Sequence, residues 1–319
     1  MIRAAVIGLG VIGKLHAELA QLNGELVAVC DIDESRLTPY SQAKQYTDYV
    51  RMLSEVEVDV VHVCTPHYLH AEMVIMALQR NVSVLCEKPL CICNEELDAI
   101  LIAEETSTAQ LAVCLQNRYL SVNQFVKDFL RKNPPVSAIG YMAWHRGETY
   151  YNSSPWRGKK SMEGGGVLIN QALHTLDLLQ WFCGDVSSVC ATVSNLTLQK
   201  MVDVEDTAFL VCDGNVPFTL FATNGSKTDF PVEITLTTEK GLLKVTPQKV
   251  LLNGEIIYAE DTSKYYIKPC YGYGHDFFVA DFYRCLENSE KFSVDGKEGA
   301  KVVKIIFAAY ESNGKTVKL

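Results

Sequence analysis

Short apolar runs alternate with stretches of helical periodicity through the first third of the chain. The runs are rich in β-branched residues and too short for helices, so they predict strands at residues 2–7, 25–30, 58–64, 82–86 and 111–115. The periodicity between them predicts helices at residues 12–24, 33–44, 67–80 and 94–109. This alternation is typical of a parallel sheet wound by right-handed crossovers.

After Tyr119 the pattern changes to consecutive strands with tight turns. A helix is predicted at residues 121–132, and the strands follow at residues 139–145, 186–193, 207–212, 218–223, 233–237, 242–245, 250–252 and 255–259. Asn253-Gly254 joins the last two as a hairpin. Further helices are predicted at residues 167–182, 275–288 and 297–312. We therefore predict an α/β Rossmann domain at residues 1–120 and an α+β domain with a mostly antiparallel open sheet at residues 121–319. The C-terminal helices are able to return to the first domain.

Composition and charge narrow the class of protein. The chain has 319 residues, of which 48% are hydrophobic, and its formal net charge is −9. A net negative charge opposes binding to nucleic acid or to an anionic membrane, both of which favour a basic face. No apolar run reaches the roughly 18 residues that a membrane helix needs. We expect small-molecule chemistry without a nucleic-acid or membrane partner.

Eleven cysteines are scattered through predicted strands and helices. An odd number spread in this way indicates buried thiols and a reducing, cytoplasmic location. Cys86, Cys91 and Cys93 come close together, but no second ligand pair at zinc-finger spacing accompanies them. We predict no metal.

A glycine-rich turn, Gly8-Leu9-Gly10-Val11-Ile12-Gly13, follows the first predicted strand and opens a helix. This is the context that a dinucleotide fingerprint requires, because the helix N-terminus offers N–H groups to a pyrophosphate. Asp31 ends the second strand, where its carboxylate is suited to the adenosine ribose hydroxyls. The cofactor prediction is NAD in preference to NADP, since a 2′-phosphate would meet Asp31 and Arg36 lies five positions further on. The alternative is that the glycines only pack the sheet and Asp31 caps the next helix.

Two further turns come at strand ends and are predicted to line the same crevice. Glu87-Lys88-Pro89 closes the strand at 82–86, and a proline there forbids its continuation. Thr65-Pro66-His67 follows the strand at 58–64, where a structural turn explains it equally well. Glu87 has a plain alternative, which is an ion pair with Lys88 or another neighbour.

The segment after Gly164-Gly165-Gly166 carries a polar stripe. On a helix, Asn170, His174 and Asp177 fall within about 60° of one another on an otherwise apolar surface. A polar stripe on a buried helix must face partners, water or a ligand. His174 suits proton transfer near neutral pH, whereas Lys88 is ordinarily a cation and is expected to orient a hydroxyl and share the proton with His174.

An aromatic and basic segment precedes those glycines. Within it, Trp156 and Arg157 are suited to stacking on a sugar and clamping a phosphate or carboxylate. A solvated basic loop is the alternative. Arg118 at the predicted domain junction is a further candidate for substrate contact, with packing equally plausible.

Together these residues resemble the Gfo/Idh/MocA family of NAD(P)-dependent oxidoreductases. The motifs that carry the resemblance are the glycine turn, Asp31, Glu87-Lys88-Pro89 and the triple glycine through His174. The resemblance implies hydride exchange with sugars or cyclitols, Lys88 and His174 as the catalytic pair, and a homodimer or homotetramer formed through the open sheet. One departure is Asn170, because many sugar and inositol dehydrogenases of the family carry aspartate there, and an amide cannot take a proton.

Three functions remain open at this point. The leading prediction is an NAD-dependent dehydrogenase of a sugar, cyclitol or sugar derivative. The family resemblance also admits an NAD-dependent redox-assisted glycosidase and a non-catalytic dinucleotide-binding sensor. Retention of both Lys88 and His174 favours an enzyme.

Overall fold

The computed structural model describes residues 1–261 and 273–319. Contacts divide the chain into unit 1, Met1–Leu115 with His275–Ala300, and unit 2, Gln116–Gly274 with Lys301–Leu319. None of the helices in the described ranges is long and apolar enough to cross a membrane.

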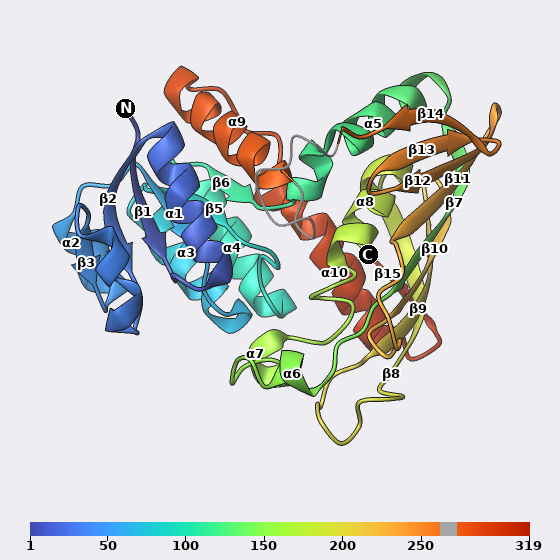
Figure 1. Ribbon diagram of the computed structural model, residues 1–319, viewed down its shortest axis with the longest axis horizontal. Helices are drawn as coiled ribbons and strands as arrows, with labels where there is room; N and C mark the ends of the chain where they lie inside the picture. Colours follow the sequence, from blue (N-terminus) through green and yellow to red (C-terminus); the bar gives the residue numbers. More distant parts are fainter. Residues whose placement is uncertain (262–272) are drawn as a thin grey trace. The chain divides into compact units, whose positions relative to one another are not determined.

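Unit 1 is built on a six-stranded parallel sheet (Figure 1). Its strands are β1 (Arg3–Ile7), β2 (Glu25–Cys30), β3 (Lys44–Tyr46), β4 (Val60–Val63), β5 (Ser83–Cys86) and β6 (Leu111–Val113). The order β3-β2-β1-β4-β5-β6, with every pair parallel, is that of a Rossmann sheet. The central strands are almost fully buried, as expected for a sheet covered on both faces. The α/β prediction is confirmed for this unit.

Helices connect and cover these strands. They are α1 (Val11–Asn23), α2 (Tyr49–Glu55), α3 (His70–Gln79), α4 (Asn94–Thr106) and the part of α9 (Gly274–Asn288) that belongs to unit 1. The rings of Phe278 and Phe282 pack edge-on against Phe292, so the segment His275–Ala300, distant in sequence from the first sheet, contributes to the core of unit 1.

The predicted helix at residues 33–44 is wrong. Two 3₁₀ turns, Glu34–Arg36 and Thr38–Tyr40, occupy the segment and lead into β3. Pro39 explains the difference, because proline has no N–H to donate and its ring clashes with the preceding helical turn.

Unit 2 is built on a nine-stranded sheet in the order β14-β13-β12-β11-β7-β10-β9-β8-β15. The strands are β7 (Pro135–Ala143), β8 (Val186–Ser194), β9 (Thr207–Gly214), β10 (Phe218–Thr223), β11 (Glu233–Thr238), β12 (Gly241–Thr246), β13 (Lys249–Leu252), β14 (Glu255–Ala259) and β15 (Thr316–Lys318). Only β7 and β10 pair in parallel among these strands, so the predicted mostly antiparallel sheet is confirmed. Asn253 and Gly254 have φ of 52° and 90°, as a primed hairpin turn requires.

One face of this sheet is covered by helices (Figure 1). The helices of the unit are α5 (Ser121–Lys132), α6 (Glu148–Tyr151), α7 (Lys160–Glu163), α8 (Leu173–Cys183) and part of α10 (Gly296–Ser312). Gly140 of β7 permits the close approach of α8, because a Cβ there would lie 2.6 Å from Leu179 Cδ1. The predicted helix at residues 167–182 starts too early, since residues 167–172 form turns and the helix begins at Leu173.

The opposite face of the sheet carries exposed apolar side chains on neighbouring strands. Ile139 is 59% exposed, Phe209 47% and Tyr141 39%, and Tyr141 stacks on Phe221. Strand pairing sets Phe209, Phe221 and Tyr141 in one row across β9, β10 and β7. This row and Ile139 form an apolar face without a covering helix in the described part of the chain.

Candidate functional site

The glycine turn of unit 1 shows the geometry of a nucleotide cradle. Gly8 has φ of +86°, and a Cβ there would lie 2.7 Å from the Cys64 carbonyl oxygen. A Cβ on Gly13 would lie 1.8 Å from the carbonyl oxygen of Gly8, so only glycine lets α1 approach the turn. A Cβ on Gly10 would meet nothing within 4 Å, and the backbone at the start of α1 therefore faces open space. These features fit a bound pyrophosphate.

The Asp31 carboxylate joins the end of β2 to this turn. Its Oδ2 accepts the Leu9 backbone N–H at 2.7 Å, and its Oδ1 accepts the Asp33 N–H at 2.9 Å. Arg36 also reaches Asp31, with Nη1 at 3.4 Å from Oδ2. Arg36 lies five positions after Asp31 in the sequence, but the 3₁₀ turn Glu34–Arg36 brings its cation beside the Asp31 carboxylate.

His70 ties together the two other predicted crevice turns. Its Nδ1 lies 2.7 Å from the Pro89 carbonyl oxygen and its Nε2 lies 2.8 Å from the Thr65 carbonyl oxygen. Burial lowers the pKa of His70, while these two carbonyl contacts favour the protonated ring. Thr65-Pro66-His67 and Glu87-Lys88-Pro89 are thus bound to one imidazole inside unit 1.

The Glu87 side chain points into the core of unit 1. His16 Nε2 lies 2.9 Å from Glu87 Oε1, and His275 Nε2 lies 3.3 Å from the same oxygen. Burial by itself would raise the pKa of Glu87, but the hydrogen bonds from His16 and His275 hold it well below its usual value. Lys88 follows as a half-buried residue at the carboxyl end of β5, with a cis bond to Pro89.

In unit 2, His174 stands in the first turn of α8. Together with Trp181 it is one of two residues in this helix that are not buried. The helix packs against β7, β10 and α5 of the same unit.

Asn170 lies before α8 rather than on it and belongs to a separate polar cluster. Its amide donates to Tyr150 Oη at 3.1 Å and to the buried carboxylate of Glu163. Gln171 donates to the same Tyr150 oxygen at 2.7 Å, and burial raises the pKa of Tyr150. The predicted stripe of Asn170, His174 and Asp177 is therefore divided, because the helix that would align them starts too late.

Arg157 joins this cluster through Tyr150. Its guanidinium carbon lies 4.4 Å from the centroid of Tyr150 and 4.7 Å from that of Trp156, and Nη1 donates to Tyr150 Oη. Stacking between two rings holds the planar cation in one orientation. Arg157 is thus held between ordered partners, whereas Lys159 and Lys160 of the same segment are exposed.

Arg118 and Asp177 are buried against each other within unit 2. Arg118 Nη2 lies 2.6 Å from Oδ1 and Nε lies 2.9 Å from Oδ2, with side-chain exposures of 4% and 1%. Both carboxylate oxygens are engaged by one guanidinium. This bidentate pair links the 3₁₀ turn Gln116–Tyr119 to α8.

Glu163, Glu205 and Tyr310 were missed by the sequence reasoning. Glu205 accepts the Gly166 N–H at 2.8 Å, the Leu168 N–H at 3.0 Å and the Tyr310 hydroxyl at 3.0 Å. A Cβ on Gly165 would lie 1.9 Å from Tyr310 Oη, which explains the glycine there. A buried carboxylate that gathers N–H groups from a distant turn leaves no local signal in the sequence.

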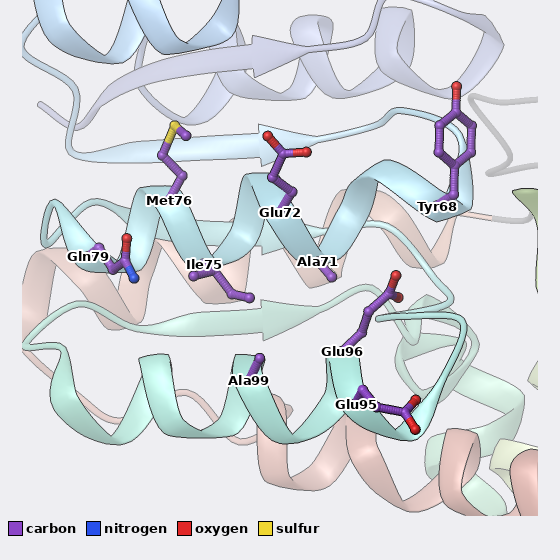
Figure 2. Close-up of a pocket in the computed structure, with 9 residues that line it drawn as sticks. All are labelled: Tyr68, Ala71, Glu72, Ile75, Met76, Gln79, Glu95, Glu96 and Ala99. Carbon is purple, nitrogen blue, oxygen red and sulfur yellow. The ribbon is translucent and has the colours of Figure 1, made fainter.

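Figure 2 shows a groove between α3 and α4 that none of the predicted site residues lines. Its volume is about 580 Å³, and it carries three carboxylates, those of Glu72, Glu95 and Glu96. Tyr49 donates to Glu72 at 2.6 Å and the Ile92 N–H donates to Glu96 at 2.9 Å. This acidic lining opposes a phosphate ligand, so the groove is distinct from the nucleotide cradle.

The cradle, the acidic residue at the end of β2 and the Rossmann order of strands define a dinucleotide-binding protein. A model described as oxidoreductase family, NAD-binding Rossmann fold matches residues 2–115, and a GFO/IDH/MocA C-terminal domain matches residues 135–244. The chain belongs to the Gfo/Idh/MocA family, which confirms the predicted resemblance. It is an NAD-dependent oxidoreductase.

Named relatives extend this picture. 1,5-Anhydro-D-fructose reductase of Ensifer adhaerens is 24% identical over 304 residues, which cover 91% of this chain and 87% of the relative. D-Glucoside 3-dehydrogenase of Escherichia coli is 31% identical over 195 residues, which cover 57% of this chain and only 54% of that relative. The WlbA dehydrogenase of Bordetella pertussis, solved with NADH and UDP-GlcNAcA, is 26% identical with a TM-score of 0.87, covering 100% of this chain and 98% of that one.

Proposed function

We propose that this protein is a dehydrogenase that exchanges a hydride between NAD and a hydroxyl group of a sugar, cyclitol or sugar derivative. The observation that carries the proposal is the nucleotide cradle combined with Lys88 at the carboxyl end of β5 in a chain of this family. Relatives named as acting on sugars support the substrate class. When bound, NAD accepts or returns the hydride.

Two residues of this chain are proposed to act on the substrate hydroxyl. Lys88 is proposed to orient the substrate hydroxyl as a cation and to stabilise the developing alkoxide. His174 is proposed to take the hydroxyl proton, since an imidazole titrates near neutral pH and Asn170 cannot act as a base. The cofactor is proposed to contact the turn Gly8–Gly13, Asp31, the turn Thr65–His67 and the Glu87-Lys88 backbone.

The polar cluster of unit 2 is proposed to bind the rest of the substrate. Trp156 offers an aromatic face, Arg157 a fixed cation, and Asn170 an amide. The guanidinium favours a carboxylate or phosphate, and UDP-GlcNAcA, the ligand in the Bordetella pertussis complex, carries such groups. An acidic sugar derivative is therefore the preferred substrate class. Arg118 and Asp177, engaged by each other, are assigned a supporting role.

Assembly and location follow the same reasoning. The exposed apolar face of the nine-stranded sheet supports a homodimer or homotetramer. The ten cysteines in the described part of the chain are free thiols, which supports a reducing cytoplasmic compartment.

The test is NADH formation with a panel of neutral sugars, cyclitols, uronates and nucleotide sugars. Lys88→Ala should lower kcat by about 10² to 10³-fold, the usual contribution of a donor that stabilises developing charge in the transition state. Lys297→Ala, an exposed lysine of unit 1, is the matched control and should retain activity. Full activity of Lys88→Ala would reject the mechanism. Sugar release without NADH would indicate the glycosidase, and tight NAD binding without turnover would indicate the sensor.

A further inference from the structure

Glu87 stands at the end of a row of buried polar side chains in unit 1. His16 of α1 contributes Nε2 at 2.9 Å from Glu87 Oε1. The other ring nitrogen of His16, Nδ1, lies 2.9 Å from Nδ1 of His62 in β4. His62 Nε2 in turn lies 2.9 Å from the hydroxyl of Tyr283 in α9. These are hydrogen-bond distances, so four side chains from four segments form one chain.

The protonation of each member follows from its surroundings. Burial lowers the pKa of His16 and lowers that of His62 well below its usual value, so both rings are neutral near pH 7. Burial also raises the pKa of Tyr283, which therefore keeps its hydroxyl proton. Glu87 is ionised and can only accept hydrogen bonds.

These states permit one direction of donation only. Because Glu87 accepts, His16 must carry its proton on Nε2 and accept at Nδ1. His62 must then donate from Nδ1 and accept at Nε2. Tyr283 donates to that nitrogen, and every contact is satisfied.

A metal site is the competing explanation. His16, Glu87, Cys114 and His275 bring potential ligand atoms within 4.8 Å of one another. Nitrogen and oxygen ligands of tetrahedral zinc, each about 2.0–2.2 Å from the metal, lie roughly 3.3 Å or more apart. The 2.9 Å between His16 Nε2 and Glu87 Oε1 is shorter and has the length of a hydrogen bond. The geometry therefore favours the hydrogen-bond chain.

The hydrogen-bond chain reaches Lys88 through the second carboxylate oxygen of Glu87. Oε2 accepts the backbone N–H of Lys88 at 3.2 Å, so the direction in which the Glu87 carboxylate points is coupled to the backbone of the proposed catalytic lysine. In the described part of the chain, the other titratable groups that face Glu87 from neighbouring elements are Cys64, Cys86, Cys114, His70 and His275, with Asp276 beside His275. The three thiols are neutral, since burial raises the pKa of each.

We propose that Tyr283, His62 and His16 form a hydrogen-bond chain of fixed direction that keeps Glu87 an anion and thereby positions Lys88. His16 is a positioning residue, because it acts through Glu87 and not on the substrate. The effect on catalysis rests on the proposed function of Lys88. The hydrogen-bond chain itself can be tested without measuring activity.

The first experiment reads the tautomers directly. Long-range nitrogen–proton NMR spectra of full-length protein labelled with ¹⁵N-histidine resolve which ring nitrogen carries the proton, and the sequence has only seven histidines to assign. His16 should be protonated at Nε2 and His62 at Nδ1, without titration near pH 6.5. The opposite tautomers, an ordinary titration of His16, or stoichiometric zinc in the purified protein would each overturn the proposal.

The second experiment measures the pH profile of kcat. His16→Leu removes a donor to a buried carboxylate, so the pKa of Glu87 should rise by about one to two units and move the Glu87-dependent acidic limb of kcat upward, separately from the limb that the proposed base His174 sets. His16→Gln restores an N–H donor and should recover most of this shift. Tyr283→Phe, which keeps the ring, should move the limb in the same direction while NAD affinity is retained.

The two experiments separate the possible failures. A loss of thermal stability with an unchanged pH profile would assign the chain a structural role only and overturn the positioning proposal. If no substrate is turned over, the proposed function fails, and the tautomers measured by NMR still decide whether the hydrogen-bond chain exists.

Discussion

The ion pair between Arg118 and Asp177 makes a quantitative prediction about stability. Both side chains are nearly inaccessible to solvent, and the contact is bidentate. Asp177→Asn removes the carboxylate charge and leaves the guanidinium buried without its counter-ion. Breaking a buried pair in this way costs about 3–5 kcal/mol of unfolding free energy.

The assay follows from the positions of the tryptophans. All three, Trp144, Trp156 and Trp181, belong to unit 2, so intrinsic fluorescence during urea unfolding reports on the unit that contains the pair. The Arg118 guanidinium lies 5.5 Å from the Trp181 ring centroid, which gives the probe local sensitivity.

A matched control is available on the surface of the same unit. Arg131 and Asp128 pair at 2.9 Å with side chains 73% and 66% exposed. Asp128→Asn should change stability by less than about 1 kcal/mol, because solvent screens an exposed pair. The double variant Arg118→Met with Asp177→Leu should recover most of the loss, since no charge is then left buried.

If Asp177→Asn is no more destabilising than Asp128→Asn, the buried pair does not stabilise unit 2 as expected. A substrate role for Asp177, as the sequence suggested, predicts a different result, namely a raised KM at unchanged stability. The two roles are therefore separable with one variant and two measurements.

Three further predictions concern the cofactor turn, cofactor choice and assembly. Gly10→Ala adds a methyl group in open space, so it should weaken NAD binding roughly tenfold at unchanged Tm. Gly13→Ala clashes within the turn and should lower Tm, and calorimetry that finds equal Tm losses for the two variants would contradict this. Asp31→Ala leaves the Arg36 cation beside the ribose position and should raise kcat/KM for NADP relative to NAD by about tenfold. An unchanged ratio would show that Arg36 does not contribute to cofactor choice. Ile139→Arg should reduce the mass measured by light scattering, because it sets a charge in the exposed apolar face, and an unaltered mass would point to another interface.

Much of the fold was predictable because the relevant signals are local. Apolar runs bounded by turn residues identify the strands of both sheets except the short edge strands β3 and β15, which were not predicted. Asn253-Gly254 identifies a hairpin by its backbone preference alone. The helix predicted at residues 33–44 does not form because Pro39 does not continue a helix. The early start given to α8 failed because Glu205, far along the chain, draws the N–H groups of residues 166 and 168 into a turn.

The residues of the candidate site also fall into those that local sequence reveals and those that it does not. The glycine turn and Glu87-Lys88-Pro89 are contiguous in sequence, and the chemistry of each is recognisable from order and spacing. The partners of buried carboxylates are not contiguous. Glu163 meets Asn170, and Glu205 meets Tyr310, only because unit 2 brings separate segments together.

By itself the sequence determined the class of fold, the family and the preference for NAD, since these depend on periodicity and on short motifs. Only the tertiary structure decided what each charged group does. Glu87 could be expected to pair with a neighbour, but its donors, His16 and His275, lie at opposite ends of the chain. A buried carboxylate stays ionised only where hydrogen-bond donors reach it, and the tertiary fold decides which donors do.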